Sequence, residues 1–283
     1  MTFQLYGFNT KLNETSDKLL NSTLTNLPEH DRIKIQKFYF KKDKVLSLLG
    51  RLLTGCLFLN YHKHHQLQLE FKDVSNLITR NELEKPLIKS DNPLLKNFKF
   101  NISHHGYWVV GISSDQGEIG IDVSKYEIKP DMFDAFSSTF STHEWNWIKS
   151  VNGEGQTQRI ACLWALKESY VKAIGCGITV DLDLISFILE PIQNSSTENF
   201  WVCNVSLTFL MNHSLTNIYV WKDNLMSIKL KVKGQEKMDW VFRLVELDDE
   251  HVMAIASTYK DIQSLDFNIL NWSDIYQTCD FDQ

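Results

Sequence analysis

The sequence predicts a protein that mixes α-helices and β-strands, and three stretches of the 283-residue chain support that prediction. Residues 31–61 place apolar residues at helical spacing, with Lys and Arg between them. Residues 107–123 hold two β-rich runs separated by Ser, Asp and Gly, which is typical of a hairpin. Residues 180–257 alternate apolar and polar side chains, as in "MSIKLKV" and "FWVCNVSLTFL", so we expect strands to dominate there.

Composition limits the kinds of protein that this chain can be. Hydrophobic residues make up 43% of it and charged residues 23%, which fits one large domain or two of about 100–150 residues. The formal net charge of −6 argues against nucleic acid as the main partner. No apolar run approaches the roughly 18–20 residues that span a bilayer, and no secretory signal is visible. The five cysteines are scattered, which suits reduced thiols in a reducing compartment. With no signal and no membrane span visible, we expect a cytoplasmic protein with no membrane partner, and we expect it to be a monomer.

The first half of the chain should contain a short strand, two helices and a loop region. "FQLYGFN" near the start predicts the strand, and residues 31–61 predict the two helices. Residues 84–101 contain two of the five prolines and predict a loop with a short strand.

The second half shows clearer helix boundaries. Ser141 and Glu144 form a capping box, which predicts that a helix starts there. A longer helix is expected from about Gln156 to Ile174, with Gly175 as its C-cap. "QLYGFN" and "EIGIDV" resemble each other, and this weak repeat suggests two related halves.

The longer helix places polar residues at the edge of its apolar stripe. Trp164, Glu168 and Lys172 are each four residues from the next and line one flank. A Glu–Lys pair at this spacing also occurs as a plain surface ion pair, so it does not indicate function by itself. Lys167 falls within the apolar stripe, and we expect it either to snorkel to solvent or to reach a ligand.

Several side chains could bind a metal ion or phosphate. Asp122 ends an apolar strand after Gly120, and with Glu168 it could hold Mg²⁺; a turn aspartate is the alternative. Ser103 and His104 in "FNISHHG" offer donors at a turn, which suits phosphate. Basic residues that add anion-binding capacity, or simply form a solvated face, are Lys34, Lys37, Lys41, Lys42, Arg80 and Lys85. The chain has no phosphate-loop, dinucleotide-binding, G-x-S-x-G or H-E-x-x-H motif.

Three motifs in order, "FNISHHGYWVVGIS", "IGIDV" and "WALKESYVKAIGCGI", resemble those of the 4′-phosphopantetheinyl transferases. The similarity is to the larger, pseudo-dimeric class, which includes the surfactin-synthetase and aminoadipate-reductase activators. It runs from about residue 31 to residue 257 and includes "KFYFKKDKVLSLLGRLL", "EKPLI" and "DEHVMAIAS". The resemblance implies an α+β fold with two pseudo-symmetric halves, residues 1–117 and 118–265, and the coenzyme cleft between them. Residues 266–283, rich in Asp, Asn and Gln, would be a loose tail.

The resemblance also implies a reaction. An enzyme of the holo-[acyl-carrier-protein] synthase type transfers the 4′-phosphopantetheine arm of coenzyme A to a serine of an apo carrier domain and releases 3′,5′-ADP, with Mg²⁺ as cofactor. The expected carrier is that of aminoadipate reductase, in lysine biosynthesis. The same chemistry on a fatty-acid, polyketide or peptide synthase carrier is an alternative, and so is a non-catalytic protein that binds coenzyme A or a carrier.

Site residues follow from the matching motifs. Asp122 and Glu168 match the magnesium ligands, and Glu168 also matches the residue that helps activate the attacking hydroxyl. Lys172 matches the lysine that contacts the coenzyme A pyrophosphate, which makes Asp122, Glu168 and Lys172 the catalytic set. Ser124 stands where many bacterial members carry a third acidic ligand, and the eukaryotic aminoadipate-reductase activators resemble this chain in lacking that acid. The other implied coenzyme-binding residues are Ser103 and His104 at the phosphates, Asn101 in the same motif, Lys85 of K-P, and Lys34 and Arg80 at the 3′-phosphate.

Overall fold

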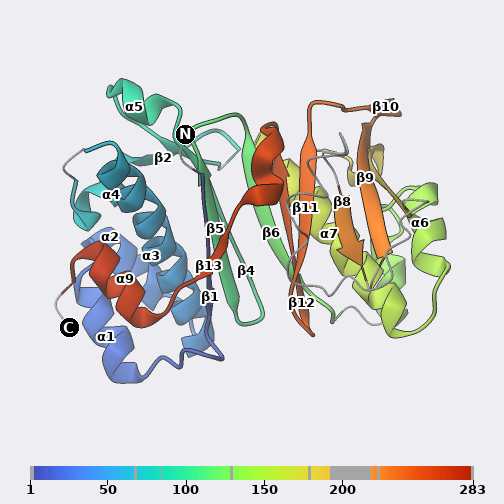
Figure 1. The fold of residues 1–283 in the computed structure, drawn as a ribbon. Coiled ribbons are helices and arrows are strands. Elements are labelled where there is room, and N and C mark those ends of the chain that lie inside the picture. Colours follow the sequence, from blue (N-terminus) through green and yellow to red (C-terminus); the bar gives the residue numbers. More distant parts are fainter. Residues whose placement is uncertain are drawn as a thin grey trace.

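The computed structural model describes residues 3–66, 69–83, 85–127, 130–177, 180–191, 218–221 and 224–281, and it mixes helices and strands as the sequence predicts. A four-stranded sheet and a group of helices form one side of the molecule (Figure 1). In spatial order its strands are β13 (Phe267–Ile269), β1 (Phe3–Asn9), β5 (Trp108–Ser114) and β4 (Lys99–His105). Helix α3 lies against this sheet and is itself contacted by other helices. The helices are α1 (Asp17–Thr25), α2 (Glu29–Gln36), α3 (Lys41–His64), α4 (Phe71–Leu77) and α9 (Trp272–Cys279).

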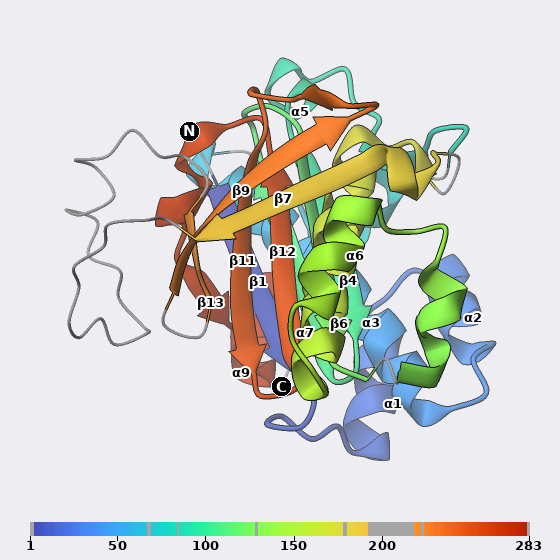
Figure 2. The ribbon, with the colours of Figure 1, turned by 90° about the vertical axis from the view of Figure 1, so that its right-hand side faces the viewer.

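The other side of the molecule is built around one long helix, α7 (Glu154–Ile174). It packs against strands of a three-stranded sheet, and α6 (Thr142–Lys149) lies beside it (Figure 2). That sheet has the order β11 (Val241–Asp248), β12 (His251–Ser257) and β6 (Ile119–Lys125). A further sheet has the order β10 (Gln235–Glu236), β9 (Asn224–Val232) and β7 (Ile185–Pro191), with β8 (Ile218–Trp221) also paired to β9.

Short elements complete the described chain. β2 (Ile78–Arg80) pairs with β3 (Pro86–Ile88), which is the short strand expected within residues 84–101. The others are α5 (Pro93–Lys96) and the 3₁₀ helices η1 (Pro130–Phe136), η3 (Leu182–Leu184) and η4 (Lys260–Ser264).

The hairpin predicted for residues 107–123 is wrong. β5 pairs with β1 and β4, whereas β6 pairs with β12, so the two runs belong to different sheets. Each strand takes the partners against which its buried faces fit: β5 forms a tight hairpin with the preceding β4 and also pairs with the distant β1, and β6 pairs with the distant β12. β4 instead reaches β6 through side chains that accept hydrogen bonds from alternate backbone N–H groups, each at 3.3 Å: Asn101 Oδ1 from Ile121, Ser103 Oγ from Val123 and His105 Nδ1 from Lys125.

The expectation of a loose tail at residues 266–283 is also wrong for the part that the structure describes. β13 pairs in parallel with β1. Ile275 and Cys279 of α9 are 0% and 3% exposed and belong to the same core cluster as the apolar side chains of α3. Asn271 caps α9 together with Asp274, so polar residues that suggested a tail serve to start a helix.

The local helix signals are confirmed. Ser141 and Glu144 form the capping box at the start of α6. Gly175 ends α7 at φ 67°, a left-handed conformation in which glycine avoids the strain of a Cβ atom. "MSIKLKV" lies in β9 as expected, whereas "FWVCNVSLTFL" lies outside the described residues.

Glycine brings β6 unusually close to α7. A Cβ atom at Gly120 would clash with the carbonyl oxygen of Ser169 and would lie 2.6 Å from the nitrogen of Ala173. The strand therefore lies directly on the helix, and Asp122, two residues further along β6, faces the same helix surface. This close contact positions the site described below.

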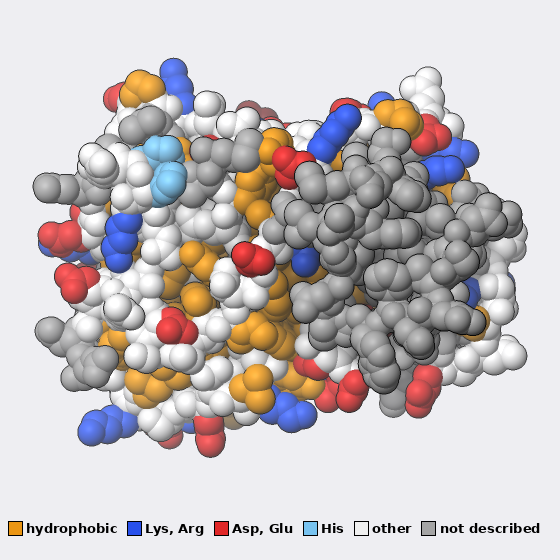
Figure 3. All heavy atoms as spheres, in the orientation of Figure 1, with side chains coloured by type: hydrophobic (Ala, Val, Ile, Leu, Met, Phe, Trp, Pro, Cys, Tyr) orange, Lys and Arg blue, Asp and Glu red, His pale blue; other side chains and the backbone are white. Residues whose placement is uncertain are grey.

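The described helices include no membrane span, and one face of the molecule shows charges of both signs. None of the helices in the described ranges has the length and apolar character that crossing a membrane requires. On the described part of the face in Figure 3, acidic and basic side chains are interspersed.

Candidate active site

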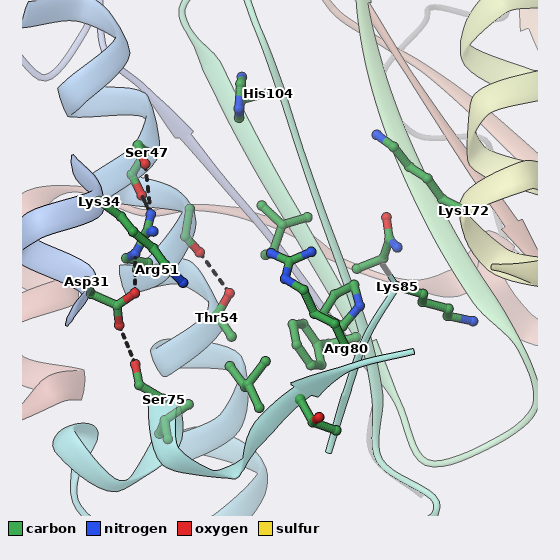
Figure 4. A pocket seen from close by; sticks show the side chains of 18 of the residues that line it. Asp31, Lys34, Ser47, Arg51, Thr54, Ser75, Arg80, Lys85, His104 and Lys172 are labelled. Atoms are coloured by element: carbon green, nitrogen blue, oxygen red, sulfur yellow. Dashed lines mark hydrogen bonds and ion pairs between the residues drawn. The ribbon is translucent and has the colours of Figure 1, made fainter. Parts of the chain in front are cut away.

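A cavity of about 730 Å³ lies between the two sides of the molecule. Residues of α2, α3, α4 and β2 form one wall, and residues of β4 and α7 form the opposite one (Figure 4). The predicted site residues that line it are Lys34, Arg80, Lys85, Asn101, His104, Glu168 and Lys172. Ser103 and Asp122 are bonded to Lys172, so the structure brings the residues predicted from separate motifs to one place.

Asp122, Ser103 and Lys172 form a hydrogen-bonded group that joins β4, β6 and α7. Lys172 Nζ donates to Asp122 Oδ1 at 2.6 Å and to Ser103 Oγ at 3.0 Å. Ser103 Oγ donates to the same carboxylate oxygen at 2.7 Å. The side chain of Asp122 is 9% exposed and that of Lys172 is 28% exposed, so the lysine remains accessible from the cavity.

Glu168 stands near this group but does not share its bonds. Its side chain is half-buried on the cavity wall, and no hydrogen bond or ion pair ties it to another described residue. Burial and the negative charge of Asp122 raise the pKa of Glu168, while the charge of Lys172 lowers it. Glu168 is therefore a carboxylate near a second carboxylate, with its oxygens available to a ligand.

These two carboxylates fit a hard divalent cation. Both offer oxygen ligands, and Mg²⁺ commonly binds one or two protein carboxylates while phosphate and water complete its coordination. A cation would also relieve the repulsion that raises the pKa of Glu168. Among the described residues no group of three or more His, Cys, Asp or Glu side chains could enclose a metal ion by itself, so the protein would supply only part of the coordination shell.

Ser124 lies on the same face of β6 as Asp122, because side chains alternate along a strand. It is 2% exposed, and β6 pairs it with Val252 of β12. A neutral, buried hydroxyl therefore lies on the strand face that carries Asp122.

Lys85 lines the cavity, but its ammonium group is bonded elsewhere. Lys85 Nζ donates to the carbonyl oxygen of Ala173 in the last turn of α7 at 2.6 Å and pairs with Glu118 at 3.3 Å. Lys99 pairs with the same glutamate. Figure 4 shows Lys85 and Lys172 pointing in opposite directions. In this state Lys85 connects the β2–β3 side of the cavity to the end of α7.

His104 occupies the cavity wall close to Lys172. Partial desolvation and the positive charge of Lys172 lower the pKa of His104, while Asp122 and Asp43 of α3 oppose this. The ring is therefore neutral at neutral pH and can donate one hydrogen bond to an anion.

The opposite end of the cavity is basic and includes an arginine that the sequence analysis did not single out. Lys34 of α2, Arg51 of α3 and Arg80 of β2 line this end, and the Arg80 side chain extends toward the other two (Figure 4). Arg51 Nε donates to Asp31 Oδ1 at 2.7 Å, and its Nη1 donates to Ser47 Oγ at 2.7 Å. The signal in the sequence was a single charge within the apolar run "SLLGRLLTG".

Asp31 holds this arginine in place. It is buried, and its other carboxylate oxygen accepts from Ser75 Oγ at 2.7 Å. Burial alone would raise the pKa of Asp31, but the bonds from Ser75 and Arg51 outweigh it and lower the pKa. The guanidinium is therefore held in a fixed position at this end of the cavity, where Asp31 balances its charge.

The expectation that Lys167 snorkels or reaches a ligand is wrong. Its side chain is 0% exposed, and its Nζ lies 2.9 Å from Glu144 Oε2. It also donates to the carbonyl oxygens of Leu182 and Ile185. Lys167 therefore links α7 to α6 and to the start of β7, away from the cavity.

Known proteins similar to this chain point to one family. The sequence model of the 4′-phosphopantetheinyl transferase superfamily matches residues 118–256, and the model of the 4′-phosphopantetheinyl transferase N-terminal region matches residues 14–116. The human L-aminoadipate-semialdehyde dehydrogenase-phosphopantetheinyl transferase is 26% identical over 272 residues, covering 88% of this chain and 77% of the human one.

Two bacterial relatives are more similar over shorter stretches. The 4′-phosphopantetheinyl transferase ffp of Bacillus subtilis is 30% identical over 185 residues, covering 65% of this chain and 75% of its own. The 4′-phosphopantetheinyl transferase Sfp of Bacillus subtilis strain 168 is 34% identical over 167 residues, covering 59% and 68%. With both halves of the chain matched and the motif residues gathered at one cavity, the chain belongs to the 4′-phosphopantetheinyl transferase superfamily, in its larger class.

Proposed function

We propose that this protein transfers the 4′-phosphopantetheine arm of coenzyme A to a serine of an apo carrier domain at the cavity wall formed by Asp122, Glu168 and Lys172. The observation that carries the proposal is the meeting of these three side chains from β6 and α7 beside a cavity with a basic far end. A protein that only bound the coenzyme would not need a lysine and two carboxylates gathered where its diphosphate would lie.

Carrier-protein phosphopantetheinylation with coenzyme A is the reaction of the family to which this chain belongs. More specifically, we propose that the enzyme is of the holo-[acyl-carrier-protein] synthase type. As its protein substrate we propose the carrier domain of an aminoadipate-semialdehyde dehydrogenase, also called aminoadipate reductase. The name of the human relative supports that choice. A carrier of a fatty-acid, polyketide or peptide synthase is the alternative.

The proposed coenzyme site spans two halves, residues 1–117 and 118–265. The boundary between the two matching family models, at residues 116 and 118, supports this division. The cavity is lined from the first half by residues such as Lys34 and His104 and from the second by Glu168 and Lys172. Residues 267–279 pack with the first half, so we extend that half to include them.

Charge suggests the orientation of the coenzyme in this cleft. We place the 3′-phosphate end at Lys34, Arg51 and Arg80, where the cavity is basic. The diphosphate then lies near His104 and Lys172, and the arm extends past Glu168. Lys85 would contact a phosphate only after leaving the carbonyl oxygen of Ala173.

The reaction forms a bond between the carrier serine oxygen and the phosphorus next to the pantetheine, and it breaks the bond from that phosphorus to the bridging oxygen of the diphosphate. Glu168 accepts the hydroxyl proton, directly or through water, and its raised pKa favours that role. Lys172 stabilises the charge on the departing 3′,5′-ADP, and Ser103 orients both Lys172 and Asp122. A magnesium ion held by Asp122 and Glu168 would supply further charge neutralisation when bound.

Mass spectrometry of apo carriers tests the proposal. The protein is incubated with coenzyme A, Mg²⁺ and the apo carrier of an aminoadipate-semialdehyde dehydrogenase, with an acyl carrier and a peptidyl carrier in parallel. The carrier should gain the mass of the phosphopantetheine arm, and the same carrier with its acceptor serine changed to alanine should not. Binding of coenzyme A without a mass gain on any carrier would favour the non-catalytic alternative. We also propose that the enzyme works as a cytoplasmic monomer, which sedimentation and cell fractionation would test.

A further inference from the structure

Three consecutive aromatic side chains are exposed between α2 and α3. Phe38 is 44% exposed, Tyr39 89% and Phe40 66%, and Ile33 of α2 adds an apolar side chain that is 47% exposed. We call these four residues the aromatic patch. The rings of Tyr39 and Phe40 pack edge to face with their centroids 5.0 Å apart, so they present one apolar surface. Exposed apolar clusters with a polar rim commonly mark protein interaction sites.

The aromatic patch does not belong to the coenzyme cavity. None of its four residues lines that cavity, although Lys34, which follows Ile33 in the sequence, and Ser47 of α3 do. A coenzyme that filled the cavity would therefore leave the aromatic rings exposed. The patch needs a different occupant.

The position of the patch indicates which occupant. The patch adjoins the cavity, because Lys34, next to Ile33 in α2, and Ser47 of α3 both line it. A macromolecule that contacts the patch would thus stand beside the cavity. The second substrate of the proposed reaction, a folded carrier domain, must bring its serine to the cavity from solvent.

The charges around the patch indicate the chemistry of that occupant. Lys37 and Lys42 are exposed, and neither forms an ion pair with a described residue, whereas Lys41 pairs with Asp17 at 2.7 Å. An apolar centre with unpaired lysines at its rim fits a partner surface that combines apolar and acidic side chains. A membrane or a second copy of this chain would use the same apolar centre, and both are outcomes of the test below.

We infer that the aromatic patch, with Lys37 and Lys42 at its rim, is a docking surface for the carrier domain, which binds there through an apolar and acidic face. This inference rests on the proposed function and adds to it the place where the protein substrate binds. It assigns Tyr39 and Phe40 a role in recognition of the carrier and none in the chemistry.

The test compares the Tyr39→Ala, Phe40→Ala double variant with Met238→Ala. Met238 is a matched control because it is 78% exposed and apolar and lies next to β10, far from α2 in Figure 1. Initial rates of carrier modification are measured against the concentration of the aminoadipate-semialdehyde dehydrogenase carrier and, separately, of coenzyme A. The double variant should raise the KM for the carrier about tenfold or more and leave the KM for coenzyme A and the maximal rate nearly unchanged. Met238→Ala should leave all three nearly unchanged.

A second arm tests the charged rim. Changing both Lys37 and Lys42 to alanine should raise the KM for the carrier. For the wild-type protein this KM should increase from low to physiological salt concentration, and the increase should be smaller for the variant. Thermal melting should be unaffected in both variants, since the changed side chains are exposed.

Each other result overturns the inference. An unchanged carrier KM in the double variant would mean that the patch does not bind the carrier, and a raised coenzyme A KM would assign it to the coenzyme. A wild-type dimer dissolved by Tyr39→Glu in sedimentation, with carrier KM unaffected, would assign it to self-association. Binding to anionic vesicles that the double variant loses, again with carrier KM unaffected, would assign it to a membrane. Failure of the wild-type protein to modify any carrier would reject the proposed function itself, which is a separate result.

Discussion

Helix α7 carries two lysines, five residues apart, and each pairs with a carboxylate from another element. Lys167 pairs with Glu144 of α6 at 2.9 Å, and Lys172 pairs with Asp122 of β6 at 2.6 Å. The two pairs have similar distances and the same chemistry, but their surroundings differ completely. The side chains of the first pair are 0% exposed, whereas those of the second are 28% and 9% exposed at the wall of the cavity.

We call Lys167–Glu144 the inner pair and Lys172–Asp122 the outer pair. In the inner pair, other groups of the protein supply the remaining hydrogen bonds of both side chains. Lys167 also donates to two backbone carbonyl oxygens, and Glu144 accepts from the backbone nitrogens of Phe187 at 2.9 Å and Ser141 at 2.8 Å. Burial lowers the pKa of Lys167, and the charge of Glu144 opposes that change. Buried charges that are paired and bonded in this way hold elements together and are unavailable to a substrate.

In the outer pair the lysine remains available. Lys172 borders a cavity, and the neighbouring carboxylate of Glu168 has no hydrogen bond or ion pair to a described residue. Because the two ion pairs have similar distances but different exposure, the distance alone does not identify a functional lysine. What identifies it is solvent access together with a nearby group whose charge is not compensated.

The largest effect should come from removing a carboxylate of the outer site. Asp122→Ala and Glu168→Ala should each lower turnover roughly 10²–10⁴-fold, the size expected when a general base or a charge-stabilising group is lost. Turnover is measured with saturating coenzyme A and carrier at several magnesium concentrations. Near-normal turnover of either variant would reject the proposed mechanism.

The inner pair should affect stability instead. Lys167→Met leaves the buried charge of Glu144 without its partner and should lower the free energy of unfolding by about 3–5 kcal/mol. Lys172→Met should lower it by less, because Lys172 is 28% exposed and Ser103 still donates to Asp122, but it should abolish most activity. Urea unfolding of both variants measures this contrast. Equal destabilisation by the two variants would contradict the distinction between the pairs.

The contribution of Glu168 to the stability of the fold should depend on pH. Its pKa is raised above the usual 4.5, so the folded protein holds that proton more tightly than the unfolded chain. Ionisation of Glu168 therefore destabilises the fold as the pH rises through the raised pKa. Glu168→Gln should be inactive, yet slightly more stable than the wild-type protein at neutral pH in the absence of metal.

The control for this prediction is the same comparison in acid. The gain in the urea midpoint should disappear below about pH 4.5, where Glu168 is protonated in both states. A gain that does not vary with pH would show that the effect arises from packing and not from charge.

The smallest effect is expected at Ser124. Its hydroxyl is neutral, so Ser124→Ala should cost less than about tenfold in activity, in line with a contact worth roughly 1 kcal/mol. Assaying Ser124→Ala and Asp122→Ala together during a magnesium titration checks the ranking. Equal damage in both would mean that Ser124 is an essential ligand or that the metal site is elsewhere.

The sequence by itself determined the features that depend on neighbouring residues. The capping box at Ser141, the end of α7 at Gly175 and the helical spacing of Glu168 and Lys172 are local, and all are present in the structure. The motif order also determined the family, which fits the meeting of Asp122 with Lys172 at one cavity.

Only the tertiary structure decided which distant groups meet. β5 and β6 look like a hairpin in sequence, but they joined different sheets: β5 lies between the preceding β4 and the distant β1, and β6 pairs with β12, far along the chain. Lys167 and Lys172 are both lysines of one helix, and no local pattern shows that Glu144 will reach the first and Asp122 the second. Arg51 likewise became a cavity residue only because Asp31 and Ser47 hold its guanidinium there. Such pairings depend on burial and on contacts between residues remote in sequence, which the spacing of residues along the chain does not encode.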